Sequence, residues 1–421
     1  MLYLILVMIH IYDEYERNFI MKKTELNDIT DEKEKREEIE ESVHNGIQVT
    51  GILEVTNDGY GFIRSDNYLS GSQDVYVSQT QIRRFNLKTG DMLTGFIREP
   101  KPGERFRAFM YTTAINGLNP NVAKERKQFE DLTPIFPNKR ISLGEDGNIS
   151  MRIIDLISPI GKGQRGVIVS PPKAGKTTLL KNIALSIQKS NPEIHLLILL
   201  IDERPEEVTD IKEAIMGDNV EVIYSTFDEL PERHKKVSEM VIERAKRLVE
   251  CGQDVMILLD SITRLARAYN LTVTPSGRTL SGGLDPTSLY MPKRFFGAAR
   301  NTRESGSLTI LATALVETGS KMDDVVYEEF KGTGNMELVL SRKLQERRIF
   351  PAIDILKSGT RREDLLLNEK ELEVMNIIRK SLNSLKSEQA LDNLLYMFKK
   401  TRNNEELIKY ILSKNTIVTG E

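Results

Sequence analysis

"SPPKAGKTTLL", residues 170–180, differs at one position from the phosphate-binding pattern G-x-x-x-x-G-K-[ST], because Ser170 stands where the first glycine is expected. The apolar run GVIVS ends at Ser170, and a helix-forming run begins at Lys176. A loop between a strand and a helix is the context in which this pattern binds phosphate. The substitution removes backbone freedom but no phosphate-binding group, so we predict a nucleoside triphosphate site in an α/β domain. The alternative is an ordinary turn before a helix.

The chemistry of each group in this loop suggests its role. Gly175 lets the backbone approach the phosphates, Lys176 would reach the β- and γ-phosphates, and the Thr177 hydroxyl would bind Mg²⁺. The residues predicted to bind the nucleotide are Lys173, Ala174, Gly175, Lys176, Thr177 and Thr178.

Two other apolar runs end in acidic residues. DVMILLD ends at Asp260, where a carboxylate would orient Mg²⁺. HLLILLIDE ends at Asp202 and Glu203, and either could polarise the attacking water. Because an unpaired carboxylate at the tip of a buried strand is costly, two such ends beside a phosphate loop favour catalysis. One of them could instead cap the following helix.

The apolar runs also divide the chain into domains. From about residue 152, near-continuous apolar runs alternate with helical segments, which is typical of a doubly wound α/β domain with parallel strands. Between 51 and 115, shorter alternating runs separated by Gly, Asn and Asp turns predict a small antiparallel β-barrel. The predicted boundaries are a polar tail at 1–46, a barrel at 47–117, a linker at 118–150, and an α/β ATPase domain with C-terminal helices at 151–421.

One strand of the predicted barrel has the composition of a base-stacking surface. In DGYGFIRS, Tyr60 and Phe62 are two residues apart, so both rings project from one face, and Arg64 continues that face. The platform would be completed by Tyr76, Arg105 and Phe106. Such platforms stack unpaired bases, and the pattern resembles cold-shock and OB-fold domains. The alternative is that the alternate aromatic rings fill the core of the barrel.

The composition limits the partners and the compartment. The net charge of −3 gives no overall basic field, so a nucleic-acid surface must be a local patch. The single cysteine, Cys251, excludes an intramolecular disulfide and fits a reducing cytoplasm. The apolar opening MLYLILVMIHIY is too short to cross a bilayer, so we expect no membrane partner. A start at Met21 is the favoured explanation of that opening, and a buried or interfacial helix is the alternative.

Long stretches of the chain closely resemble the bacterial transcription termination factor Rho family, from about residue 51 to the C-terminus. They are SPIGKGQRG, PPKAGKT, LLIDERPEEVTD, LLDSITRLARAYN, MPKRFFGAARN and TGSKMDDVVYEEFKGTGNMEL. The resemblance implies an OB-fold barrel followed by a RecA-like motor, assembled as a homohexameric ring that hydrolyses ATP with Mg²⁺. It further implies binding of C-rich single-stranded RNA, 5′-to-3′ unwinding, and release of transcripts from the RNA polymerase elongation complex.

The resemblance also implies roles for single residues. Lys173, Lys176 and Thr177 would hold the phosphates and Mg²⁺. Glu203 would position the hydrolytic water, and Asp260 would orient the metal.

Further roles come from the resemblance alone. Arg204 and Arg264 would sense the phosphates or contact the subunit interface, and Arg361 would be an arginine finger that reaches the neighbouring subunit. Phe350 would pack on the adenine. Asp74 and Glu104 would help to select pyrimidines. A plain core position is the alternative for Phe350.

Two glycine-bearing segments, TPSGRTLSGG and TGSKMDDVVYEEFKGTGN, resemble the RNA-contacting loops of the family's central channel. The expected contacts are Arg278, Ser281 and Lys321. In a ring, six copies of one Lys and one Arg would make a positive funnel without making the chain basic. The alternative is a pair of flexible surface loops.

The chain departs from the family pattern at three places. The helical segment that precedes the barrel is reduced to an acidic tail, Arg278 stands where Lys is common, and Phe106 lacks the hydroxyl of the Tyr often found there.

Two other classes of protein remain as alternatives. One is a RecA-like ATPase without RNA work, such as a rotary-ATPase subunit. The other is a passive RNA-binding protein with a decayed motor, although the catalytic residues are all present.

Overall fold

The computed structural model describes residues 47–64, 67–144, 147–383 and 387–418, so the predicted polar tail lies outside the described residues. The chain divides into two compact units. Among the described residues, the barrel unit comprises 47–64, 71–88 and 92–124, and the α/β unit comprises 67–70, 89–91 and the described residues from 125 to 418.

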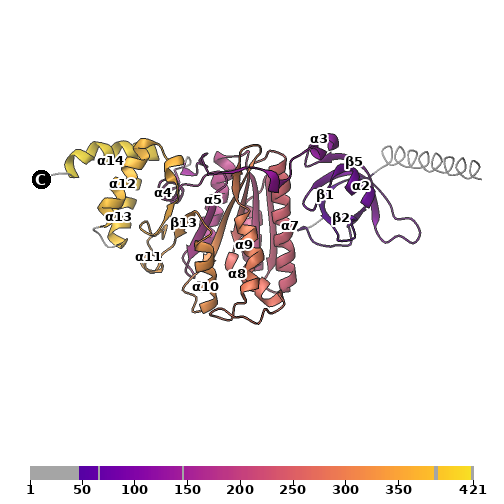
Figure 1. Ribbon diagram of the computed structural model, residues 1–421. Helices are drawn as coiled ribbons and strands as arrows, with labels where there is room; N and C mark the ends of the chain where they lie inside the picture. The colour runs from indigo at the N-terminus through magenta and orange to yellow at the C-terminus, as the bar shows by residue number, and fades with distance from the viewer. Residues whose placement is uncertain (1–46, 65–66, 145–146, 384–386, 419–421) are drawn as a thin grey trace, which may run out of the picture. The chain divides into compact units, whose positions relative to one another are not determined.

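The barrel unit is a closed barrel with the strand order β1-β2-β3-β5-β4 (Figure 1). Its elements are β1 (Ile47–Val55), β2 (Gly61–Arg64), β3 (Val75–Val77), α2 (Gln79–Phe85), β4 (Met92–Arg98), β5 (Arg107–Ile115) and α3 (Pro120–Lys124). In β4 every second residue is buried, as expected where alternate side chains point into a barrel. The inward residues form an apolar core that includes Leu53, Leu93 and Ile115.

The prediction of an antiparallel barrel was wrong for one strand pair. β3 and β5 are parallel, with Val75 opposite Arg107. The reason is the connection through α2, because the chain returns from this helix to pair β4 with β1. The next strand, β5, then closes the barrel beside β3. The other pairs are antiparallel, as predicted from the alternating runs.

The α/β unit contains a nine-stranded sheet within the described residues, with the main order β14-β13-β7-β12-β10-β8-β9. The strands from β13 to β9 are parallel, which confirms the doubly wound α/β prediction. The strands are β6 (Pro134–Ile135), β7 (Arg165–Ser170), β8 (His195–Glu203), β9 (Val220–Thr226), β10 (Val255–Asp260), β11 (Arg300–Thr302), β12 (Ser307–Leu315), β13 (Met336–Val339) and β14 (Gly359–Thr360).

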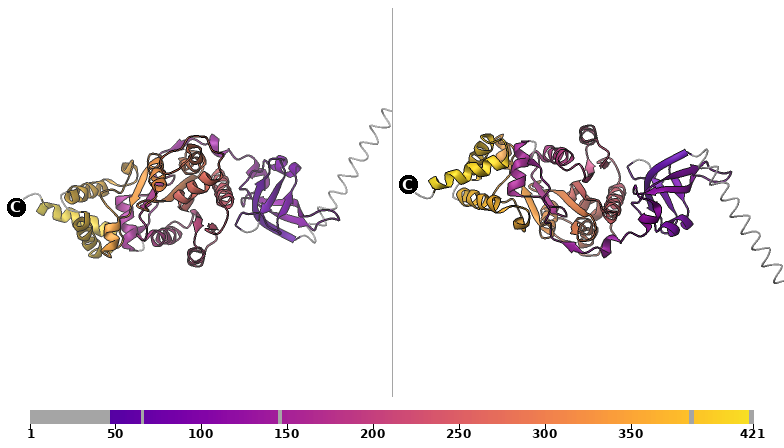
Figure 2. Two further views of the ribbon diagram at one scale, coloured as in Figure 1. Left: turned by 90° about the horizontal axis from the view of Figure 1, so that it is seen from below. Right: turned by 90° about the horizontal axis from the view of Figure 1, so that it is seen from above.

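Helices cover this sheet, and the last three gather at one end of the α/β unit in all three views (Figures 1 and 2). The helices are α4 (Ile149–Ile157), α5 (Lys176–Ser190), α6 (Pro205–Ala214), α7 (Pro231–Glu250), α8 (Ile262–Thr272), α9 (Tyr290–Gly297), α10 (Lys321–Lys331), α11 (Arg342–Glu346), α12 (Glu369–Asn383), α13 (Ser387–Lys399) and α14 (Asn404–Val418). Short 3-10 turns lie at Phe129–Asp131, Pro286–Leu289 and Glu363–Leu365. None of the helices in the described ranges is long and apolar enough to cross a membrane.

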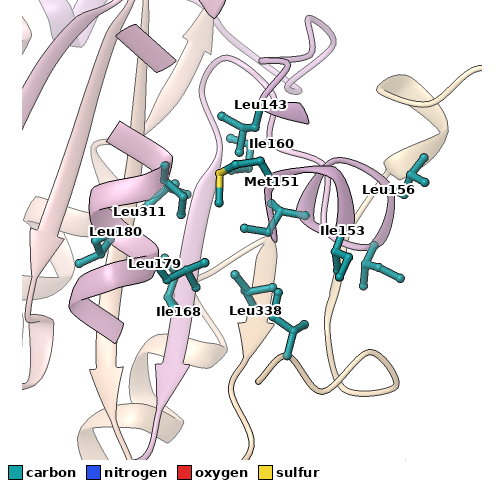
Figure 3. Close-up of a cluster of buried hydrophobic side chains, with 14 of the residues drawn as sticks. Leu143, Met151, Ile153, Leu156, Ile160, Ile168, Leu179, Leu180, Leu311 and Leu338 are labelled. Atoms are coloured by element: carbon teal, nitrogen blue, oxygen red, sulfur yellow. The ribbon is translucent and has the colours of Figure 1, made fainter. Parts of the chain in front are cut away.

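The main apolar core lies between the sheet and the helices α4 and α5 (Figure 3). Ile168 of β7, Leu338 of β13 and Met151 of α4 are fully buried in it. Because both faces of β7 are covered, its residues are apolar without alternation. This packing fixes the end of β7 from which the phosphate loop leaves the sheet.

A buried arginine fastens the C-terminal helices to this core. Arg152 of α4 donates to the carbonyl oxygens of Phe398, Thr401 and Asn403 at 2.7–3.0 Å. It also reaches the side chains of Thr401 and Asn404. Its guanidinium therefore satisfies the open carbonyl groups of the turn between α13 and α14.

Replacing Arg152 by Met should reduce the free energy of unfolding by at least about 3 kcal/mol, because several buried carbonyl groups would lose their donor. Urea unfolding followed by circular dichroism measures this change. Arg402→Met, at an exposed position in the same turn, serves as the control and should change stability by less than about 0.5 kcal/mol. Equal stability of the two variants would contradict an anchoring role for Arg152.

Candidate functional site

The phosphate loop forms between β7 and α5 as the sequence predicts. Gly175 has φ +88° at the N-cap of α5, a conformation that side-chain-bearing residues rarely adopt. No side chain caps this helix, so the first amides of α5 are left for an anion. Ser170 is fully buried and its Oγ donates to the carbonyl of Pro171 at 2.9 Å. Serine therefore fits the position of the missing glycine because it lies at the end of the strand, before the turn.

Lys176 contacts the acidic residues at the ends of β8 and β10. Its Nζ lies 2.5 Å from Oδ1 of Asp260 and 3.5 Å from Oε2 of Glu203. Both carboxylates are almost fully buried. Oδ2 of Asp260 and Oε2 of Glu203 have no hydrogen-bond partner. One ammonium group thus compensates two buried acids, and two carboxylate oxygens remain for a ligand.

A bulge in β8 gives the neighbouring acids Asp202 and Glu203 different surroundings. The pairing of β8 with β9 shifts between Ile201 and Glu203, and Asp202 has φ +55°. As a result Glu203 faces Lys176, whereas Asp202 is more exposed and lies 3.5 Å from Arg264. Burial raises the pKa of Glu203, and the charge of Lys176 offsets this only in part. Of the two candidates for the water-polarising acid, Glu203 has the better geometry.

The groups near Lys176 are suited to a magnesium ion. The free oxygens of Asp260 and Glu203 and the hydroxyl of Thr177 are hard donors of the kind that Mg²⁺ prefers. Within the described ranges, no three His, Cys, Asp or Glu side chains form a complete metal cage.

Phe350 and the phosphate loop line one cavity of about 320 Å³. The residues that line the cavity include Gly175 and Thr178 beside the phosphate loop, and Leu340 and Phe350. Phe350 is 51% exposed, so the alternative of a plain core position is wrong. A planar ring at this place can pack against an adenine whose phosphates lie on the loop.

The three arginines predicted to act near the phosphates have different surroundings in the structure. Arg264 contacts Glu203 at 3.5 Å, whereas Arg204 is exposed at the N-cap of α6. Arg361 follows β14, and its backbone N–H donates to the carbonyl of Asn335, beside the start of β7. The loop with Lys176 leaves the opposite end of β7. Within one chain, Arg361 therefore does not reach the phosphate loop.

The barrel unit carries an aromatic cluster outside its core. The ring centroids of Tyr60 and Phe62 are 5.7 Å apart, and Tyr76 lies 5.7 Å from Tyr60. Phe106 lies 5.0 Å from Phe62, and Arg105 lies over the Phe106 ring at 5.2 Å. None of these rings belongs to the buried core. The rings lie together on the surface, which is the arrangement that base stacking needs.

Three of the four charged residues predicted for this surface are already paired with other charged side chains. Arg64 is buried, stacks on the Phe62 ring at 4.9 Å, and pairs with both Asp74 and Glu54. Glu104 accepts two hydrogen bonds from Arg98, which lower its pKa to about 2. Oδ1 of Asp74 is buried without a partner. Arg64 thus orients its neighbours, and the unpaired oxygen of Asp74 remains for a donor group.

The two predicted channel loops meet in the α/β unit. Gly282, with φ +79°, lies so close to Met322 that a Cβ atom at this position would be 2.4 Å from its backbone nitrogen. Arg278 and Ser281 in the first loop and Lys321 at the start of α10 are exposed. Three polar side chains therefore extend from one loop cluster.

Comparison with known proteins places these features in a family. Residues 49–121 match the model of the Rho termination factor RNA-binding domain, and residues 150–360 match the nucleotide-binding domain of the ATP synthase alpha/beta family. Transcription termination factor Rho of Pseudomonas aeruginosa is 59% identical over 85% of this chain and 86% of its own length. The Bacillus subtilis protein is 57% identical over 85% of this chain and 83% of its own length.

The chain belongs to the transcription termination factor Rho family.

Solved structures support the fold of the α/β unit at lower identity. An ATPase of a type III secretion system is 22% identical, with a TM-score of 0.57 over 66% of this chain and 86% of that one. An ATP synthase subunit, NeqB, is 21% identical with a TM-score of 0.53, over 72% of this chain and 80% of that one. These two proteins share the fold alone, whereas the Rho-family RNA-binding domain argues against a rotary-ATPase subunit.

Glu207 is a site residue that sequence reasoning missed. The Thr177 hydroxyl donates to its Oε2 at 2.9 Å, and its charge contributes to the raised pKa of Glu203. Glu207 lies four residues after Glu203, in the first turn of α6. The sequence DERPEE could have indicated this residue. Glu203 ends β8, and Glu207 lies in the first turn of the helix that follows, so the two acids are close to each other.

Glu203→Gln should remove hydrolysis and yet stabilise the Rho-family chain at neutral pH. Burial raises the pKa of Glu203, so the native state binds its proton more readily than the unfolded state does, and ionised Glu203 destabilises the fold. The Tm advantage of the variant should therefore grow as the pH rises from the ordinary pKa of glutamate through the raised pKa of Glu203 and then level off, while kcat falls at least about 100-fold. Glu206→Gln, in the same turn, is the control. A variant less stable than the unaltered chain at pH 8 would contradict this account.

Phe62→Ala should weaken binding of single-stranded RNA by about 1–3 kcal/mol, the contribution of one stacked base. Fluorescence anisotropy with a labelled oligocytidine at fixed salt measures the effect. Tyr111→Ala removes an exposed ring of the same barrel that lies outside the aromatic cluster, and it should leave affinity unchanged. Equal losses for both variants would show that the cluster has no special role.

Proposed function

We propose that this chain is the ATP-driven subunit of a ring that moves 5′-to-3′ along RNA and terminates transcription. The observation that carries the proposal is the union, in one chain, of a phosphate loop with two buried acids and a surface cluster of aromatic rings. Each feature alone suits many proteins. Together they join nucleotide hydrolysis to the binding of unpaired bases.

ATP would change the partners of Lys176. Its ammonium group would exchange Asp260 for the β- and γ-phosphates, while the amides of the loop bind the phosphate oxygens. The free oxygen of Glu203 would then accept a hydrogen bond from the attacking water. Mg²⁺, when bound beside Thr177 and Asp260, would neutralise the developing phosphate charge. Phe350 would pack on the adenine.

Completion of the site would require a second copy of the chain. Arg361 is exposed and lies at the end of the sheet remote from its own phosphate loop, so it can act as an arginine finger only in a neighbouring subunit. Family membership favours six copies in a closed ring. Arg204 and Arg264 would sense the phosphates at this interface. Hydrolysis would then depend on assembly.

RNA would bind at two places in such a ring. The aromatic cluster of the barrel would hold C-rich single strands, with Asp74 accepting a base amino group and Glu104 contributing to selection. In the channel, Arg278, Ser281 and Lys321 would contact the RNA backbone. The ring would act in the cytoplasm on the RNA polymerase elongation complex.

The proposal is tested with stalled elongation complexes that carry a C-rich transcript. The purified chain should release the RNA in the presence of ATP and Mg²⁺, and Lys176→Ala should bind the transcript without releasing it. A matched transcript without cytidine is the control and should remain bound to polymerase. Release without ATP, or equal release of both transcripts, would overturn the proposal.

A further inference from the structure

A buried hydrogen bond between His234 and Ser225 lies beside the end of β8 that carries Glu203. His234 belongs to the first turn of α7, and Ser225 is the last residue but one of β9. His234 is 5% exposed and Ser225 is fully buried, and Nδ1 of the histidine lies 2.7 Å from Oγ of the serine. Polar side chains withdrawn from water are tolerated in a core when they satisfy each other. Neither side chain belongs to the nucleotide site.

Ser225 lies at the position in β9 where the bulge of β8 begins. Ser225 pairs with Ile201, whereas the next residue of β9, Thr226, pairs with Glu203. The pairing thus skips Asp202, which has a left-handed backbone conformation. A slip of one residue in this pairing would turn the Glu203 side chain to the other face of the sheet. The direction of Glu203 therefore depends on the register of the last residues of β9.

The loop between β9 and α7 adds little packing that could hold this register. The Phe227 amide donates to the Glu203 carbonyl at 3.1 Å, but the side chains of Phe227 and Leu230 are 59% and 73% exposed. The helix α7, in contrast, packs against β8 and β9 through fully buried residues such as Val237. The hydrogen bond from His234 therefore ties the end of β9 directly to a helix that is fixed on the sheet.

The imidazole of His234 also faces the charged groups around the bulge. Burial lowers the pKa of His234, and the charge of Arg264 lowers it further. The charges of Asp202 and of Glu232, in the same turn of α7, oppose this shift. A neutral ring can hold the Ser225 hydroxyl without placing a second cation beside Arg264, which lies 3.5 Å from Asp202. The ring is therefore suited to hold this hydroxyl without altering the charge of the site.

We propose that His234 is a positioning residue for ATP hydrolysis. Through Ser225 it holds the end of β9 in the register that produces the bulge, and the bulge directs Glu203 towards Lys176. The action is indirect, because the hydrogen bond of His234 is to Ser225 and not to a group of the nucleotide site. The inference rests on the proposed role of Glu203 in polarising the attacking water.

Steady-state ATP hydrolysis by the full chain, with Mg²⁺ and poly(C), tests the proposal. His234→Ala should lower kcat at least about tenfold, because Glu203 would no longer be held in place. The KM for ATP should change less than about twofold, since the phosphate loop binds the nucleotide and β9 does not. His234→Asn keeps a polar group near the position of Nδ1 and should recover most of the lost kcat. A merely structural role of His234 predicts instead a lower Tm with unchanged kcat.

Ser225→Ala is a second variant that removes one buried oxygen atom and very little volume, so it tests the same hydrogen bond with less disturbance of the core. It should lower kcat as much as His234→Ala does. The double variant should be no slower than either single variant, because the two side chains act as one unit. The assays are run at a temperature at which circular dichroism shows every variant to be folded.

His195→Ala is the matched control. His195 is also buried, and its Nε2 lies 2.7 Å from Oε1 of Glu221, but it opens β8 at the end remote from the bulge. This variant should lower Tm and leave kcat unchanged. Equal losses of kcat for His195→Ala and His234→Ala would overturn the proposal. Unchanged kcat in Ser225→Ala, or a loss of kcat that follows disassembly in light scattering, would overturn it as well.

Glu203→Gln, assayed in parallel, separates this inference from the proposed function. If Glu203→Gln hydrolyses ATP at the normal rate, the proposed role of Glu203 is wrong, and the positioning role is wrong with it. If Glu203→Gln is inactive while His234→Ala and Ser225→Ala keep full kcat, only the positioning role is wrong. Turnover without RNA gives the same comparison if poly(C) has no effect.

Discussion

The candidate nucleotide site of the α/β unit depends on the ion pairs that the ammonium group of Lys176 makes. It holds Asp260 and Glu203, which come from separate strands, β10 and β8, and which are both buried. Without it, two carboxylates would face each other in a region that excludes water. One oxygen of each acid nevertheless accepts no hydrogen bond. A binding site is thus built into the core at the cost of some stability.

The order of the strands keeps Arg361 away from the phosphate loop of its own chain. β7, β13 and β14 place Arg361 at one end of the sheet and the phosphate loop at the other. Because these two ends lie at opposite edges of the sheet, the proposed arginine finger would have to come from another copy of the chain. The same end of the sheet gathers Arg165 and Arg300, which makes the finger part of a larger cationic surface.

The sequence predicted the features that depend on local pattern. The phosphate loop, the parallel strands and the aromatic cluster follow from apolar runs and two-residue spacing around Ser170, Tyr60 and Phe62. The parallel pairing of β3 with β5 could not be predicted, because it depends on where the chain returns after α2. The choice between Asp202 and Glu203 could not be predicted either, because the bulge in β8 decides which of the two faces Lys176. No local signal marks the pairing of Arg64 with Asp74, ten residues along the chain, or the convergence of Arg165 with Arg300 from distant parts of the sequence.

The central claim is that RNA bound by this chain controls hydrolysis at Lys176. Steady-state ATPase of the purified chain with and without poly(C), at fixed salt and Mg²⁺, tests it most directly. The account predicts strong stimulation by poly(C), and loss of that stimulation at limiting RNA when Phe62 is replaced by alanine. ATP turnover that is the same with and without RNA would contradict it.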